Sequence, residues 1–342
     1  MPEITIHSYQ LPLRHTFTIA HGSHSVQDTL IVELRDEKHN GLGESTTNPY
    51  YGATLENMRE AINKVKKTVE SEKWSTPEEL WQMVSRDFKN NSFALCALDM
   101  AVHDWYGKKM GKPLYKLWDL KIDHIPVSNF TIGIDTVENM VKKIREMEWP
   151  LYKIKLGTPN DLKIIEALRK ETNAPFRVDA NCGWGVDETI SNSRILKDFN
   201  VEFIEQPLPA TDLKGMKKVF HESELPVIAD ESCQKEADVD TCYQHFHGVN
   251  IKLVKCGGIT PGLRMIARAQ ELGMKKMVGC MTESSVGISA IAHLAPLLDY
   301  VDMDGALLLA EDIADGVTVH PEGVDFPAEN GTGARLKNET KS

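Results

Sequence analysis

Apolar and polar residues alternate along the first 50 positions of the chain in the manner of β-strands. Three runs have this period-two pattern: 3–10, 15–20 and 29–35. A polar loop, 21–25, is expected between the second and third runs, and Gly41 and Gly43 predict a turn after the third. The pattern favours a small antiparallel sheet.

Helical signals follow these strands. Thr54 is placed to cap a helix that runs to about residue 70, and Thr76-Pro77-Glu78-Glu79 is a capping box with proline at the first helical position. The segment 91–109 carries apolar residues on several faces, so we expect its helix to be buried between layers. Strands followed by helices indicate an α+β domain of about 120 residues.

From residue 125 onward, strand-like runs alternate with helical segments. Eight parallel strands with seven intervening helices are predicted to close into a barrel, and an open doubly wound sheet is the alternative. No GxGxxG or Walker sequence follows the first of these strands, which disfavours nucleotide binding. The expected strands are 126–130, 151–156, 176–179, 201–205, 226–229, 248–252, 275–279 and 300–303.

The chain is therefore expected to have three parts. They are an α+β domain over 1–124, the barrel over 125–310 and a C-terminal segment over 311–342 that returns to the first domain. This last boundary rests on the polar and glycine-rich composition that begins after Leu309.

Composition and charge narrow the possible partners. The 342 residues are 41% hydrophobic and 26% charged, as in an ordinary soluble domain, and the net charge of −11 disfavours nucleic acids and anionic membranes. No apolar run reaches the roughly 18 residues of a membrane span, and the first ten residues do not resemble a signal peptide. Six scattered cysteines without a CxxC motif are typical of reduced thiols, so we expect a cytoplasmic protein.

Five strand-like runs between residues 151 and 252 end on charged residues at nearly even intervals of 22 to 26 residues. One strand, one helix and two loops fill that length, so these charges recur at the same end of successive parallel strands. In a β/α barrel this end carries the chemistry. The residues are Lys155, Asp179, Glu205, Asp230 and Lys252.

The three consecutive acids suggest a metal site. Asp179, Glu205 and Asp230 offer hard oxygen ligands on neighbouring strands, which suits Mg²⁺ with water and substrate completing an octahedron. Any one of them alone could be a solvated strand end or a helix cap. Three in register, one of them within the apolar sequence IEQP, favour the metal.

Lysines flank these acids in the sequence. Lys153 and Lys155 alternate with apolar residues, so both are expected to point into the barrel, where a lysine is costly unless it is paired or functional. Metal charge and burial both favour the neutral amine, which can then act as a base. The alternative for Lys153 is a structural ion pair with the acids. Lys252 shares a face with Asn250, whereas Lys255 has the opposite parity and is expected in a loop.

These motifs resemble those of the enolase superfamily, in particular the subgroup that resembles muconate lactonizing enzyme. The resemblance covers nearly the whole chain and implies a modified TIM barrel, (β/α)7β, with an α+β N-terminal capping domain. The motifs, in order, are GLGES, KIK, VDANCGW, IEQPLP, ADES, NIKLVKCGG and GCMTESSVG.

By this resemblance, the acids at 179, 205 and 230 bind one Mg²⁺ per subunit, and Lys155 and Lys252 are the acid and base on opposite faces of the substrate. The Mg²⁺ would stabilise an enediolate intermediate. The capping-domain loop that contains His21 and His24 would close over the substrate, and Lys153 would also contribute to substrate binding.

The end of the eighth strand indicates which reaction of the subgroup applies. Asp302 and Asp304 share one face, and dipeptide epimerases carry such a pair to hold the substrate's α-ammonium. The resemblance therefore favours a dipeptide epimerase, an isomerase. Some relatives specific for Ala-Glu have an arginine in the capping loop, but IAHGSHS has none, so another cation substitutes or the second residue is not glutamate.

Other functions remain open at this stage. Within the superfamily the alternatives are o-succinylbenzoate synthase and N-acylamino acid racemase, neither of which has an ammonium for Asp302 and Asp304 to bind. A Schiff-base aldolase would use one barrel lysine but would not need three metal-facing acids. A non-catalytic binding protein is disfavoured because all three acids and both lysines are present. The sequence leaves the side chains of the dipeptide, the stereochemical direction and homo-oligomer formation undetermined.

Overall fold

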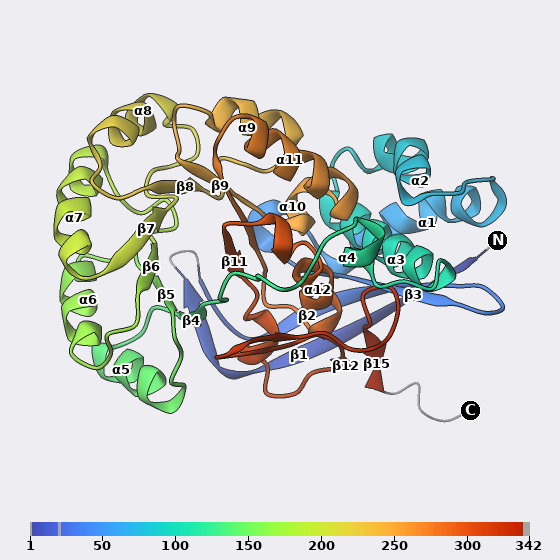
Figure 1. Cartoon of the computed structure of the whole chain (residues 1–342), viewed down its shortest axis with the longest axis horizontal. Helices are drawn as coiled ribbons and strands as arrows, with labels where there is room; N and C mark the ends of the chain where they lie inside the picture. Colours follow the sequence, from blue (N-terminus) through green and yellow to red (C-terminus); the bar gives the residue numbers. More distant parts are fainter. Residues whose placement is uncertain (1, 20–21, 338–342) are drawn as a thin grey trace.

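The computed structural model describes residues 2–19 and 22–337, and its two main parts are a sheet with helices and a barrel (Figure 1). The first part begins with a three-stranded antiparallel sheet in the order β1-β2-β3. These strands are β1 Glu3–Ile19, β2 Gly22–Arg35 and β3 Asn40–Thr46.

Two details of this sheet differ from the prediction. The run 3–10 and the described part of the run 15–20, up to Ile19, form one long strand with a pairing irregularity between Pro12 and Phe17. The predicted loop is strand from Gly22 onward because it pairs with the end of β1. Gly41 and Gly43 lie within β3. A Cβ at either position would overlap the backbone of the following α3 helix, so these glycines permit close packing instead of a turn.

The helices of the first part confirm the predicted caps at Thr54 and Thr76, whose side chains each accept a backbone N–H at the start of a helix. Glu79 accepts the N–H of Ser75 and not that of Thr76, so the predicted box is only half formed. Asn91, for which no cap was predicted, caps the third helix in the same way. The third of these helices is buried along almost its whole length because it lies between the sheet and the barrel (Figure 1). The helices are α1 Leu55–Ser71, α2 Pro77–Val84, α3 Ser92–Lys109 and the short α4 Leu114–Leu117.

The second part is a barrel of eight parallel strands in sequential order, as predicted, and the doubly wound alternative is wrong. A bridge between Ser128 and Val301 brings the first and last strands together. The first strand begins at Phe130 and not at 126, where the proline has no N–H to donate. The strands are β4 Phe130–Ile132, β5 Tyr152–Lys155, β6 Phe176–Asp179, β7 Val201–Glu205, β8 Val227–Ala229, β9 Gly248–Ile251, β10 Lys275–Gly279 and β11 Tyr300–Asp302.

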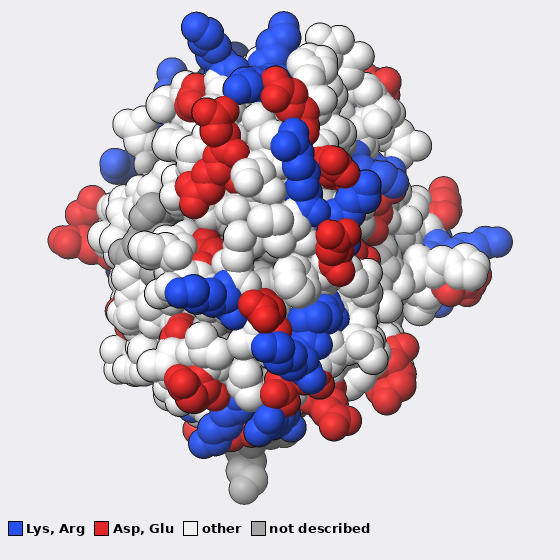
Figure 2. All heavy atoms as spheres, turned by 90° about the vertical axis from the view of Figure 1, so that its left-hand side faces the viewer, with Lys and Arg blue, Asp and Glu red and all other residues white. Residues whose placement is uncertain are grey.

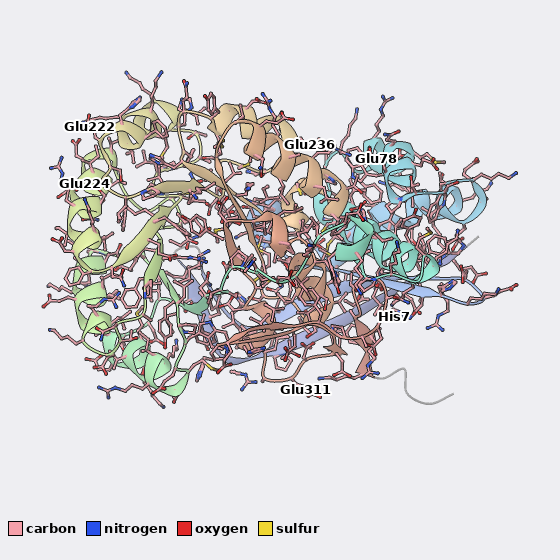
Figure 3. The ribbon with its side chains drawn as sticks, viewed as in Figure 1. His7, Glu78, Glu222, Glu224, Glu236 and Glu311 are labelled. Carbon is pink, nitrogen blue, oxygen red and sulfur yellow. The ribbon has the colours of Figure 1, made fainter. Side chains whose placement is uncertain are left out.

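Helices cover the outside of the barrel (Figure 1). An ion-pair group joins this layer to the first part: Arg264 contacts Glu236 at 2.7 Å and Glu78 of α2 at 2.9 Å. Figure 3 labels these two acids. The helices are α5 Val137–Glu146, α6 Asp161–Arg169, α7 Val186–Asp198, α8 Leu213–Glu222, α9 Glu236–Cys242, α10 Leu253–Cys256, α11 Ile259–Glu271 and α12 Ser285–Ala292.

The C-terminal segment packs against the first part. Its strand β12 (Ala314–Asp315) pairs with β15 (Arg335–Leu336), and Leu336 joins a hydrophobic cluster with Ile31 and Leu42 of the sheet. A second short pair is β13 (Thr318–His320) with β14 (Gly323–Asp325). The boundaries at 124 and 310 stay predictions.

The surface and the helices add two negative observations. Acidic and basic side chains are interspersed on the face in Figure 2, which therefore has no uniform basic patch. None of the described helices combines the length and apolarity of a membrane span.

Candidate active site

Five neighbouring strands bring the predicted charged residues into one row. Lys155, Asp179 and Glu205 end β5, β6 and β7 and are paired in register. Asp230 and Lys252 directly follow β8 and β9. Because these strands are adjacent in the barrel, the three acids lie in the middle and one lysine lies at each end.

The three acids of this row form a compact, buried group. Asp179 and Glu205 are 0% exposed and Asp230 is 2% exposed, and one oxygen of each lies within 4.8 Å of the others. Burial and the charge of Asp179 raise the pKa of Glu205, and a cation among the acids would relieve this repulsion. Hard oxygen donors with this spacing fit Mg²⁺.

Each lysine reaches the acid nearest to it. The Nζ of Lys155 lies 2.6 Å from Oδ2 of Asp179, and that of Lys252 lies 2.9 Å from Oδ2 of Asp230. The two ammonium groups therefore approach the acids from opposite ends of the row. A molecule bound above the acids would have one Nζ on each side.

The electrostatics of Lys252 differ from the sequence argument, which considered burial and metal charge. Burial, the largest single influence, would lower the pKa of the Lys252 ammonium, but the negative charges of Asp230 and Glu205 act together with other neighbours to leave this pKa above its ordinary value. Burial opposes the charge of Asp230 itself, yet Lys252 and Lys255 hold the pKa of that carboxyl far below its usual range.

Lys153 is the most enclosed cation of the site, with 1% of its surface exposed. Its Nζ contacts Glu205 at 2.7 Å, Asp302 at 2.9 Å and Asp179 at 3.3 Å. Burial opposes its charge, but these carboxylates keep the pKa of Lys153 well above the ordinary value. Lys153 thus bridges the row and the end of β11, and its role in substrate binding stays a prediction.

Lys255 was expected in a loop, and this expectation is wrong. The short α10 helix after β9 turns the chain back, so the Nζ of Lys255 is buried and donates to the carbonyl and Oδ1 of Asp230, each at 2.5 Å. Strand parity cannot predict this contact because the chain is no longer a strand at Lys255. Lys255 therefore contacts Oδ1 of Asp230, while Lys252 contacts Oδ2 of the same carboxylate.

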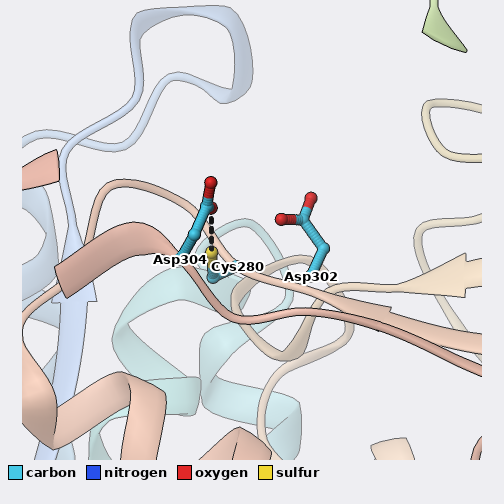
Figure 4. Close-up of side chains that lie close together, drawn as sticks. All are labelled: Cys280, Asp302 and Asp304. Atoms are coloured by element: carbon cyan, nitrogen blue, oxygen red, sulfur yellow. Dashed lines mark hydrogen bonds between the residues drawn. The ribbon is translucent and has the colours of Figure 1, made fainter. Parts of the chain in front are cut away.

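The acid pair at the end of β11 consists of Asp302, the last residue of the strand, and Asp304, two residues beyond it. Both line the same cavity as Lys155, Asp230 and Lys252 of the row. Asp302 accepts from Lys153 and from Nδ2 of Asn129 at 2.8 Å, while Oδ2 of Asp304 accepts the backbone N–H of Thr131 at 2.5 Å. The other oxygen of Asp304 faces the Cys280 thiol at 3.9 Å (Figure 4). Burial, followed by the charge of Asp302, raises the pKa of Asp304 to about 8.

Sequence reasoning did not single out several residues around this pair. Asn129, Thr131 and Cys280 are neutral and carried no pattern that would distinguish them. Glu231 was visible only as the neighbour of Asp230 in ADES. It lines the cavity, and burial together with the charge of Asp230 raises its pKa to about 8.

The first domain closes the cavity on the side opposite the barrel. Phe17 and His24 come from the ends of β1 and β2, and Tyr50 and Tyr51 come from the 3₁₀ helix Pro49–Tyr51. The His24 and Phe17 rings meet edge to face, and burial lowers the pKa of His24. The predicted contact of His21 lies outside the described residues.

Comparison with known proteins agrees with this architecture. Residues 1–118 match the mandelate racemase / muconate lactonizing enzyme N-terminal domain, and residues 135–340 match the enolase C-terminal domain-like family. The fold is that of the enolase superfamily. Within it, the chain belongs to the mandelate racemase / muconate lactonizing enzyme family.

Individual relatives are similar over almost their whole length. The L-Ala-D/L-amino acid epimerase of Flavobacterium johnsoniae is 55% identical, with 98% of this chain and 99% of the relative covered. The L-Ala-D/L-Glu epimerase of Escherichia coli is 32% identical, with 88% and 92% covered. The solved dipeptide epimerase of Enterococcus faecalis, in complex with Mg and L-Leu-L-Tyr, has a TM-score of 0.89 at 28% identity, with 97% and 98% covered.

Proposed function

We propose that this protein is a Mg²⁺-dependent dipeptide epimerase, which transfers a proton at the α-carbon of the C-terminal residue. One observation carries this proposal: a lysine from each end of the row and a separate acid pair line one cavity, together with Asp230, whose carboxylate clusters with those of Asp179 and Glu205. Relatives named as epimerases of L-Ala dipeptides support the same reaction.

The row has the ligands for one metal ion. Asp179, Glu205 and Asp230 would hold Mg²⁺, whose charge would bind the substrate carboxylate and stabilise the enediolate that forms when the α-proton leaves. Lys255 keeps Asp230 in place through its two hydrogen bonds.

The two end lysines supply the proton chemistry. The Nζ of one lysine removes the α-proton from one face, and the Nζ of the other donates a proton to the opposite face, which inverts the configuration. Their roles exchange for the reverse reaction. Their positions at opposite ends of the acids support this assignment because a two-base epimerisation needs groups on both faces.

Asp302 and Asp304 are assigned to the N-terminal ammonium of the dipeptide. Both oxygens of Asp302 are oriented by Lys153 and Asn129, and one oxygen of Asp304 is oriented by Thr131, so the pair is pre-positioned. An N-acylamino acid or an o-succinylbenzoate precursor has no ammonium at this place. Such substrates would place no positive charge next to the buried pair beyond that of Lys153.

The cavity favours a neutral second residue. The described part of the first domain lines it with Gln27, Thr46, Thr47 and Asn48 and contributes no lysine or arginine, and burial favours neutral His24. A glutamate side chain on this side would be desolvated without a cationic partner, which is costly. We therefore propose L-Ala-Xaa dipeptides with neutral Xaa as substrates.

The remaining assignments concern the cell. All six cysteines lie in the described part of the chain and are free thiols, which supports the proposed cytoplasmic location. A homo-oligomer stays open.

A panel of L-Ala-L-Xaa dipeptides incubated in deuterium oxide tests the proposed function. The wild type should introduce solvent deuterium at the α-carbon of the second residue and form the epimer. Lys155→Ala and Lys252→Ala should each lose epimerisation, and one of them can retain exchange from a single face. The exposed Lys163→Ala is the matched control. Full epimerisation by either single mutant, or borohydride trapping of a substrate on lysine, would reject the two-base scheme.

A further inference from the structure

A second cavity adjoins the candidate active site. It lies between the end of β1 and the barrel elements β4 and α5, and its apolar floor includes Phe130, Met147 and Leu307. Three residues line both cavities: Phe17, Thr131 and Leu308. These three residues form a wall between the two spaces.

The wall stands beside the acid pair. The backbone N–H of Thr131 donates to Asp304, so an ammonium held by Asp302 and Asp304 lies next to Thr131. In a dipeptide the first α-carbon is bonded directly to that nitrogen. The side chain of the N-terminal residue therefore starts close to Thr131 and to its partners in the wall.

The charged groups around the second cavity already have partners. Lys143 binds Asp135 at 2.9 Å, and Arg14 donates from Nε to the carbonyl of Leu309 at 2.8 Å. His15 lies 3.6 Å from Glu146. What remains for a ligand is the apolar floor, which matches an aliphatic side chain better than a charged one.

We propose that Phe17 and Leu308 limit the N-terminal residue of the substrate to a small side chain, and that the cavity behind them is a latent pocket for a leucine-sized side chain. This inference rests on the proposed dipeptide epimerase function. The relatives named for L-Ala substrates are consistent with a wall at this place.

Leu308 is the wall residue that can be changed with least damage. Thr131 holds Asp304 through its backbone, and Phe17 belongs to a strand end where Thr18 accepts the backbone N–H of Ile134 and Phe17 packs on His24. Leu308 is the last residue of the 3₁₀ helix Gly305–Leu308. Shortening it to alanine would join the cavities through the loss of one side chain.

The test compares kcat/KM for two dipeptides that share their second residue, L-Ala-L-Xaa and L-Leu-L-Xaa. The wild type should prefer alanine, and Leu308→Ala should shift the ratio toward leucine by about 10- to 200-fold, the range that a methylene-scale change in an apolar pocket produces. Met147→Ala is the matched control. It enlarges the second cavity without opening the wall, so the ratio should stay at the wild-type value.

The possible results distinguish a failure of the proposed wall from a failure of the proposed epimerase function. If the wild type epimerises L-Ala dipeptides but Leu308→Ala keeps the wild-type ratio, or the wild type already accepts leucine equally well, the wall is rejected. If the wild type exchanges no α-proton in any dipeptide, the proposed function is rejected, and the proposed role of the wall is rejected with it. Leu308→Val removes less of the side chain and replaces the alanine variant in the test if that variant does not fold. It should shift the ratio in the same direction by a smaller factor.

Discussion

Two groups of buried acids in this protein have the same residue types and different partners. The metal-row acids (Asp179, Glu205 and Asp230) face ammonium groups and one another. The docking acids (Glu44, Asp99 and Asp104) instead accept mainly from backbone N–H groups and hydroxyls of segments far away in the sequence. Burial alone therefore does not separate catalytic from structural acids.

The partners of the docking acids show what they do. Glu44 of β3 accepts from Ser284 and Gly287 at the start of α12, and Asp99 of α3 accepts from the backbone and hydroxyl of Thr260 in α11. These contacts fasten the first domain to the barrel. A carboxylate satisfied by fixed neutral donors needs no cation. In the metal row, by contrast, burial and the charge of Asp179 raise the pKa of Glu205 despite the nearby lysines, and a bound cation would offset this repulsion.

The largest expected effect comes from breaking the metal row. Glu205→Gln should reduce kcat/KM by at least about 10³-fold, because the lost ligand weakens the electrostatic stabilisation that a metal site provides. The fold should remain intact, since the change also removes like-charge repulsion. Added Mg²⁺ should raise the Tm of the wild type and not that of the variant.

Glu202→Gln is the control for that variant, on the same strand but paired with Arg177 at 2.8 Å. It should keep both turnover and the Mg²⁺-dependent rise in Tm. Equal turnover by Glu205→Gln and the wild type would place Glu205 among the structural acids.

The next effect concerns the acid pair. Asp302→Asn with Asp304→Asn should lower kcat/KM for a free dipeptide by about 30- to 1000-fold, because the buried ammonium loses its charged partners. The N-acetyl analogue has no ammonium, so the wild type should disfavour it and the double mutant should show no such preference. Equal use of both substrates by the wild type would favour an N-acylamino acid racemase.

The docking acids should respond in stability more than in chemistry. Glu44→Gln should lower the free energy of unfolding by about 1–3 kcal/mol, since an amide oxygen cannot serve all the donors that now reach the buried carboxylate. Ser284→Ala removes the hydroxyl that donates to Glu44 and also the N-cap of α12, where that hydroxyl accepts the N–H of Val286, so it should destabilise the protein as well. Denaturant titration measures both. A Glu44→Gln variant with wild-type stability and no turnover would move Glu44 into the catalytic group.

The clustering of the three metal-row acids and of the lysine at each end of them could be predicted from the sequence, because strand ends in a parallel barrel meet at one rim. Regular spacing therefore reported on spatial proximity for all five residues from Lys155 to Lys252. Two helix starts were equally predictable, since Thr54 and Thr76 are local cap signals. In both cases the information lies within one element or in a strict repeat of elements.

Features that depend on tertiary contacts could not be predicted. Gly43 marked a turn in the sequence, but the approach of α3 explains it, and its neighbour Glu44 gave no sign that it caps α12. Lys255 was misplaced because a one-turn helix reverses its direction. Thr131 acts through its backbone N–H, which any residue except proline supplies.

The smallest expected effect is a pH dependence that separates one docking acid from the metal row. Burial raises the pKa of Asp99 to about 7 despite its bonds to Thr260, whereas an unfolded aspartate has a pKa of about 3.9. Between these two values the folded protein binds the extra proton, so stability is lost as the pH rises from about 4 to 7. His103, 3.8 Å away, stays neutral over this range because burial lowers its pKa to about 3.

Asp99→Asn removes this titration, and the difference in unfolding free energy between variant and wild type isolates it from all other groups. The variant should lose less stability than the wild type between pH 5 and pH 8, measured by denaturant titration at constant ionic strength. Lys252 and the metal row remain unchanged in both proteins, so their titrations cancel in the difference. A difference that does not vary with pH would mean that Asp99 is ionised throughout, with its charge held by Thr260 as firmly as lysines hold the charge of Asp230.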